Sequence, residues 1–180
     1  MTTTVYTIGH STHPLEEFVS MLRAHDVNEL IDVRTVPGSR HNTQFGEAAL
    51  RVSMPAHDIH YEWMKQLGGL RHTTAASQNL AWRNSSFRGY ADYMQTPEFE
   101  TAVEDLVAEA KSRVVAIMCA EAVPWRCHRS LIGDALIVRG INVQDIISAT
   151  SVKSHTLTPF AVVDGSRVRY PAIPDDGIGT

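Results

Sequence analysis

The sequence predicts a single α/β domain whose sheet is mostly parallel and doubly wound, with helices on both faces and a C-terminal hairpin. Strand-like apolar segments alternate with amphipathic helical segments along most of the chain, which is typical of this fold class. The most apolar segment, residues 114–118, shows no polar alternation, as expected for a strand covered on both faces. A length of 180 residues with 43% hydrophobic and 20% charged residues fits one such domain.

The first half of the chain contains three expected strands and two expected helices. The first helix is expected at residues 14–25, because Leu15, Phe18 and Leu22 recur at the spacing of one helical face. Pro14 suits the first position of this helix. The expected strands are residues 5–8, 29–33 and 59–63, and the second helix is expected at residues 44–52.

The second half begins with residues 65–89, which show no clear periodicity and are interpreted as a loop. A helix then begins at Pro97, after the capping residue Thr96. Further along, we expect strands at residues 114–118 and 143–147, and between them a helix at residues 124–139 that Gly140 ends.

The C-terminal part is predicted to be an appendage of the main domain. Segments 160–163 and 167–170 flank Asp164-Gly165, a pair typical of hairpin turns. We therefore place the α/β domain at residues 1–150 and the hairpin appendage at residues 151–174, and we expect residues 175–180 to form a disordered tail.

Composition narrows the function classes. No apolar run approaches the roughly 20 residues of a membrane helix, so no membrane partner is predicted. The N-terminus lacks the features of a signal peptide, and two cysteines do not make a disulfide scaffold, so we expect a cytoplasmic protein with reduced thiols. The net charge of −4 argues against a general nucleic-acid binder. No cofactor or metal is predicted.

Three of the expected strands end in polar or reactive residues. These residues are Gly9-His10-Ser11, Asp32-Val33-Arg34 and Cys119-Ala120-Glu121. The carboxyl ends of parallel strands lie at one edge of an open sheet, where such folds bind ligands. Arginine offers a planar fork that suits phosphate and carboxylate. We therefore expect a pocket for a small anionic ligand, bound by His10, Ser11, Asp32, Arg34, Arg40 and Arg129.

The segment from residue 119 to residue 129 holds both cysteines. Cys127 and His128 each stand four residues before an apolar position of the expected helix, so helical spacing predicts that they point inward, toward Cys119. The amides of a helix N-terminus lower the pKa of a nearby thiol and bind anions. The catalytic candidates are Cys119, Cys127, His128 and Glu121.

Four interpretations of the cysteines remain open. One cysteine is a nucleophile assisted by His128 or Glu121; or both cysteines bind a metal together with His128 and a further histidine; or they form a redox pair; or they are buried apolar fillers. A phosphatase loop is excluded, because six residues rather than five separate Cys119 from Arg126.

We predict thiol-based chemistry on a small anionic substrate that contains phosphate or sulfur. Two alternatives come from other classes of protein. One is a nucleic-acid-binding or nucleic-acid-processing module that uses the arginine and aromatic side chains of residues 65–93. The other is a non-catalytic interaction domain.

A series of short motifs extends over about residues 5–150. They are Thr7-Ile8-Gly9-His10-Ser11, Asp32-Val33-Arg34, Pro37-Gly38-Ser39-Arg40, Leu67-Gly68-Gly69, Phe87-Arg88-Gly89-Tyr90, Cys119-Ala120-Glu121 and Cys127-His128-Arg129. Together, and in this order, they resemble the domain-of-unknown-function 488 family. The resemblance implies a compact α/β domain and supplies no established reaction.

A looser resemblance links residues 30–34 and 115–119 to rhodanese-like domains, in which a later buried strand ends in the catalytic cysteine. It implies a Rossmann-like or rhodanese-like sheet, and a Cys119 that carries a persulfide or attacks an anionic substrate. The loop after Cys119 differs, since Glu121 and Pro124 stand where those domains have a short glycine-rich loop.

Overall fold

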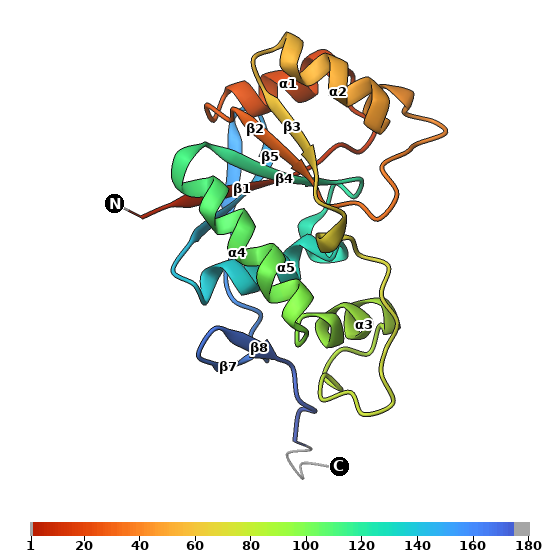
Figure 1. Ribbon diagram of the computed structural model, residues 1–180, viewed down its shortest axis with the longest axis vertical. Helices are drawn as coiled ribbons and strands as arrows, with labels where there is room; N and C mark the ends of the chain where they lie inside the picture. Colours follow the sequence, from red (N-terminus) through yellow and green to blue (C-terminus); the bar gives the residue numbers. More distant parts are fainter. Residues whose placement is uncertain (1, 175–180) are drawn as a thin grey trace.

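Five parallel strands and one antiparallel strand form the main sheet of the computed structural model, which describes residues 2–174. The strand order is β3-β2-β4-β1-β5-β6, with β6 antiparallel to β5 (Figure 1). This arrangement confirms the predicted α/β fold with a mostly parallel sheet. The strands are β1 (Thr4–Gly9), β2 (Glu29–Asp32), β3 (His60–Trp63), β4 (Val115–Cys119), β5 (Asn142–Ser148) and β6 (Ser151–Ser154).

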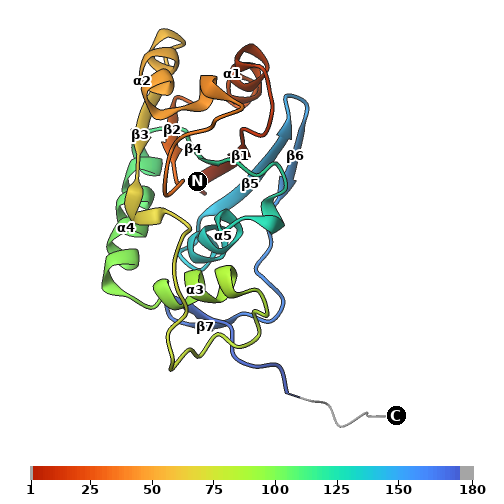
Figure 2. The same cartoon turned by 90° about the vertical axis from the view of Figure 1, so that its right-hand side faces the viewer.

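Helices cover both faces of the sheet, as Figure 2 shows. On one side lie α1 (Leu15–Arg23) and α2 (Glu47–Ala56), and on the other lie α3 (Ser85–Tyr93), α4 (Pro97–Ser112) and α5 (Arg129–Ile137). Strand β4 is buried along its whole length and contributes to both cores. Successive side chains of a strand point to opposite faces, so Met118 joins the core under α1 and α2, whereas Cys119 joins the core under α3 to α5.

The C-terminal hairpin is present. Strands β7 (Val162–Asp164) and β8 (Arg167–Arg169) pair around Gly165, whose φ of +64° is a left-handed conformation that glycine adopts without strain. Strand β6 was not predicted, because all four of its residues are exposed and show no burial pattern. Strand β6 extends the main sheet. The division between an α/β domain and a hairpin appendage at residue 150 stays a prediction. The expected tail, residues 175–180, lies outside the described residues.

Residues 65–89 are not a continuous loop. They contain a 3₁₀ turn at Lys65–Leu67 and the beginning of α3. Asn84 caps α3 by accepting hydrogen bonds from two main-chain N–H groups of its first turn. Serines and Gly89 lower the helical propensity of this segment, which explains why periodicity did not reveal the helix.

Within residues 2–174, the structure contains no helix with the length and apolar character needed to cross a membrane.

Candidate functional site

Three of the strands end side by side, as the sequence predicts. The register pairs Gly9 of β1 with Cys119 of β4, and Asp32 of β2 with Met118 of β4. Their carboxyl ends therefore lie at one edge of the sheet. This edge brings the two strand-end motifs of β1 and β2 next to the motif that begins at Cys119.

The chain beyond β1 stays bonded to the chain beyond β4. The main-chain N–H groups of His10 and Ser11 donate to the carbonyl oxygens of Cys119 and Ala120, at 3.0 and 2.9 Å. Gly9 permits this close crossing, because an added Cβ would lie 1.9 Å from the carbonyl oxygen of Glu121. The segment after Cys119 is thus fixed against the end of β1.

The two cysteines touch at this edge. Their Sγ atoms lie 2.6 Å apart, compared with about 2.05 Å in a disulfide bond. Both are free thiols and both are buried, with exposures of 3% for Cys119 and 7% for Cys127. A disulfide bond between them requires only a small movement of either side chain.

Cys127 reaches this position through a break in the expected helix. Pro124–Arg126 form a 3₁₀ turn, Cys127 is extended with φ −134° and ψ 148°, and α5 begins at Arg129. The continuous helix predicted for residues 124–139 is therefore wrong here, because the short-range bonding of the turn ends at Cys127. The burial of Cys127 agrees with the predicted inward direction, although helical spacing does not produce it.

The two thiols differ in acidity. A hydrogen bond from Cys119 lowers the pKa of Cys127 to about 7, against the opposing effect of burial and with the help of the nearby Arg129 charge. Burial, followed by the hydrogen bond with Cys127, raises the pKa of Cys119. When the pair loses a proton near neutral pH, Cys119 therefore keeps its own proton and the thiolate forms on Cys127.

Arg129 is fully buried beside the thiol pair, with 1% exposure. Its main-chain N–H lies 3.5 Å from Cys127 Sγ, Nη1 donates to Thr7 Oγ1 at 3.1 Å, and Nη2 donates to the Glu121 carbonyl oxygen at 2.6 Å. Within residues 2–174 it forms no ion pair with a carboxylate, and its Nε has no hydrogen-bond partner. A buried charge is costly unless it is compensated, and the Cys127 thiolate supplies compensation.

His128 turns its ring toward the same pair. Its Nε2 lies 2.8 Å from the Val33 carbonyl oxygen, which can only accept, so Nε2 carries the hydrogen. The lone pair of Nδ1 then faces Cys127 Sγ at 3.5 Å. Burial lowers the pKa of His128, so the imidazole is neutral at pH 7 and able to accept a proton.

Asp32 and Arg34 form a buried, two-pronged ion pair. Arg34 donates from Nε to Oδ1 at 2.9 Å and from Nη2 to Oδ2 at 2.6 Å, and the hydroxyl of Tyr61 donates to Oδ2 at 2.6 Å. Nε2 of His10 lies 3.3 Å from Nη1 of Arg34, and burial lowers the pKa of His10 so that its neutral ring accepts. The charge of Arg34 is thus largely neutralised before any ligand arrives.

A cavity of about 480 Å³ opens over the thiol pair. Cys119, Cys127, His128, Arg34 and the exposed Glu121 line it, so it brings together five of the predicted site residues. The other lining residues were not predicted as site residues, and Val36, Leu70, Phe87 and Arg126 are among them.

The other predicted site residues lie elsewhere. His10 and Ser11 line a neighbouring cavity of about 410 Å³, which shares the wall at Glu121. Arg40 is exposed and lines neither cavity among the described residues, and Arg129 lies beneath the thiol pair. The sequence could have indicated Arg126 as a site residue, because it directly precedes Cys127.

The arginine and aromatic side chains of residues 65–93 largely contact one another. The guanidinium of Arg71 lies 3.6 Å from the ring centroid of Tyr93. Arg88 donates to the Trp82 carbonyl oxygen at 3.0 Å, and the Trp82 ring stacks on Phe87 at 4.9 Å. These groups hold α3 and its loop together.

A family model described as "Domain of unknown function DUF488" matches residues 14–136, which is more than half of the chain. The match confirms the resemblance that the motifs carry. No curated protein and no solved structure matches the chain.

Proposed function

We propose that this chain, which belongs to the family described as Domain of unknown function DUF488, performs thiol–disulfide exchange through Cys127 and Cys119. The observation that carries the proposal is the 2.6 Å separation of the two Sγ atoms beneath an open cavity. Of the four interpretations of the cysteines, the redox pair accounts best for this contact and for the unequal acidity of the two thiols.

In the first step, the Cys127 thiolate attacks a small disulfide, R–S–S–R′. A bond forms between Cys127 Sγ and the sulfur of R, the S–S bond of the substrate breaks, and R′S⁻ leaves. A pKa of about 7 suits this attack, because a thiol whose pKa is near the ambient pH combines a useful thiolate fraction with high nucleophilicity. Where Cys127 is still protonated, Nδ1 of His128 is placed to take the proton.

In the second step, Cys119 resolves the mixed disulfide. Its Sγ attacks Cys127 Sγ, the Cys119–Cys127 bond forms, and the departing thiolate leaves with the Cys119 proton as RSH. The substrate has then gained two electrons, which the protein has lost. A dithiol reductant returns them by the reverse exchange, which suits the reducing, cytoplasmic compartment expected from the sequence.

The lining of the cavity supports a small substrate with apolar and anionic parts. Phe87, Val36 and Leu70 offer apolar contacts, and Arg126 offers a guanidinium that suits a carboxylate. A phosphate ester is less well supported, because the contact between the two thiols favours a disulfide as the reacting group. The sequence predicts a small anionic substrate that contains phosphate or sulfur. Within that class, we propose a disulfide that carries carboxylates.

Glutathione disulfide, an anionic disulfide, is a suitable probe. The reduced wild-type protein should lose both thiols and form an intramolecular disulfide, which intact-mass spectrometry detects. Cys119→Ser should stop at a mixed disulfide on Cys127, and Cys127→Ser should react more than about tenfold more slowly. Because the chain has 2 cysteines, each product is unambiguous.

Circular dichroism checks that both variants are folded. The proposal fails if folded wild-type protein forms no intramolecular disulfide. It also fails if Cys127→Ser reacts through Cys119 as fast as the wild type reacts.

A further inference from the structure

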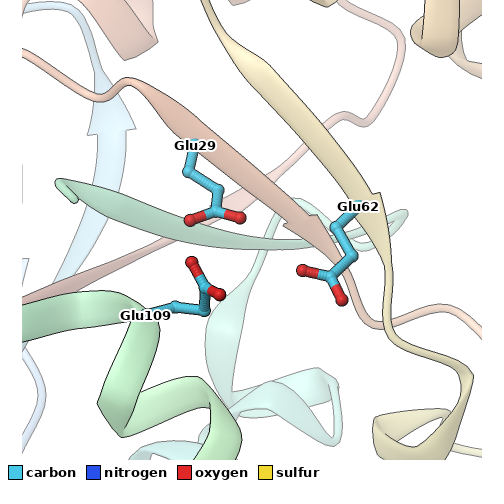
Figure 3. A group of neighbouring side chains, drawn as sticks. All are labelled: Glu29, Glu62 and Glu109. Atoms are coloured by element: carbon cyan, nitrogen blue, oxygen red, sulfur yellow. The ribbon is translucent and has the colours of Figure 1, made fainter. Parts of the chain in front are cut away.

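Three glutamates from separate elements converge away from the thiol pair. Glu29 begins β2, Glu62 belongs to β3 and Glu109 belongs to α4. Figure 3 shows their carboxylates facing one another, and one oxygen of each lies within 4.8 Å of the others. Glu29 pairs with Val115 at the beginning of β4, whereas Cys119 ends that strand, so the two places are about 13 Å apart along the strand.

Glu29 contributes a buried oxygen that the protein leaves unsatisfied. The residue is 1% exposed, and its Oε1 lies 3.2 Å from Nδ1 of His60. Its Oε2 has no hydrogen-bond partner, and the ionic contact to Nε of Arg113 is 3.9 Å long. An unsatisfied buried carboxylate oxygen is costly, and here it stands among two more carboxylates. A cation bound between the three would satisfy it.

The approach to the cluster is acidic. A cavity of about 530 Å³ is lined by Glu62 and Glu109 together with Glu98 and Asp105, and no lysine, arginine or histidine of residues 2–174 lines it. Such a cavity attracts cations.

We infer that Glu29, Glu62 and Glu109 bind a divalent, oxygen-preferring cation, with Ca²⁺ as the best fit. Oxygen ligands lie about 2.3–2.6 Å from Ca²⁺, so ligands on opposite sides of the ion are about 4.6–5.2 Å apart. The glutamate oxygens lie within 4.8 Å of one another, so all three can be ligands of a single Ca²⁺ ion. Mg²⁺ holds its ligands closer and demands stricter geometry, so it binds more weakly here. The ion ties α4 to β2 and β3, and water from the cavity completes its coordination.

Calorimetric titration of the chelator-treated full chain with Ca²⁺ and Mg²⁺ tests the site, together with thermal unfolding in each ion. Ca²⁺ should bind saturably and raise Tm. Glu62→Gln and Glu109→Gln should each weaken Ca²⁺ binding by about tenfold or more and abolish the rise in Tm. Glu104→Gln is the matched control, because Glu104 is an exposed carboxylate of α4 outside the cluster and its cavity.

Each glutamine substitution also removes repulsion between the carboxylates, so its effect on Tm must be measured separately from its effect on Ca²⁺ binding. Without added cation, Glu62→Gln and Glu109→Gln should keep or raise Tm, so only the shift that Ca²⁺ produces reports on the site. Glu29→Gln is not the deciding variant, since its side chain is buried. Absence of saturable Ca²⁺ binding at millimolar concentration overturns the inference, as does equal weakening in Glu104→Gln.

Discussion

The imidazole of His128 packs directly against the main chain of Gly69: a Cβ added to Gly69 would lie 2.6 Å from Nδ1. On another side the ring contacts Tyr90, whose ring centroid is 5.0 Å away. The hydrogen bond to the Val33 carbonyl oxygen fixes the ring's rotation. Packing and bonding together therefore hold Nδ1 toward Cys127.

Gly69→Ala should lower the free energy of unfolding by about 1–3 kcal/mol, because the new methyl group overpacks the contact with His128. Gly38→Ala is a matched control, since Gly38 lines the same cavity and its added Cβ would meet nothing within 4 Å. Urea denaturation measures both. Equal stability of the two variants would show that the ring of His128 moves aside freely.

The rate of iodoacetamide labelling at Cys127 should rise with pH around a midpoint of about 7, since the thiolate is the reactive form and the pKa of Cys127 is lowered to that value. Cys119 should label only at higher pH, because burial raises its pKa. Mass spectrometry of peptides separates the two sites. Labelling of Cys119 ahead of Cys127 at pH 7 would reverse the assignment of the nucleophile.

Replacement of Cys119 tests the hydrogen bond that favours the Cys127 thiolate. Cys119→Ala removes the donor and should raise the pKa of Cys127 by about one unit or more. Cys119→Ser keeps an O–H donor and should retain most of the lowering. The pH profile of Cys127 labelling measures both, and identical midpoints in the two variants would argue against this hydrogen bond.

Arg129→Gln should also raise the pKa of Cys127, by about one unit, because it removes the buried positive charge that favours the thiolate. Arg129→Lys retains the charge and should retain the lowered pKa of Cys127, and it provides the comparison if Arg129→Gln is poorly folded. Arg126→Gln should behave differently: it should leave the labelling midpoint unchanged and slow the reaction with glutathione disulfide. Equal midpoints in wild type and Arg129→Gln would remove Arg129 from this role.

Asp32→Asn should lower the free energy of unfolding by about 3–5 kcal/mol, because it leaves the guanidinium of Arg34 buried without its carboxylate. Tyr61→Phe removes one hydrogen bond to the same carboxylate and should cost only about 1 kcal/mol. Chemical denaturation of both variants measures the difference. A loss below that of Tyr61→Phe would mean that Asp32 is not the counter-charge of Arg34.

The common edge of the site was predictable from the sequence, because it follows from parallel strands alone. Cys119 and Asp32 end recognisable strands and His10 directly follows one, and parallel strands end at one edge whatever their order. The contact between Cys119 and Cys127 depends instead on the extended conformation of Cys127. No periodicity marks a single extended residue between a 3₁₀ turn and a helix.

The inward position of Arg129 was predictable from helical spacing, as was the inward direction of Cys127 and His128. Arg129 stands three residues before the buried Ile132, a spacing that places both on one helical face. Arginine is seldom fully buried, which favoured the prediction that Arg129 binds the anionic ligand directly. The glutamate cluster gave no such signal, because Glu29, Glu62 and Glu109 are far apart in the chain and only the packing of α4 on β2 and β3 joins them.

The short chain distance between the two cysteines sets how a bond between them would act on the fold. A cross-link between residues 119 and 127 closes a small loop, so it removes only about 2–3 kcal/mol of conformational entropy from the unfolded chain. Most of the stability of the domain therefore resides in its two cores. The proposed exchange would therefore form and break this bond repeatedly while the domain stays folded.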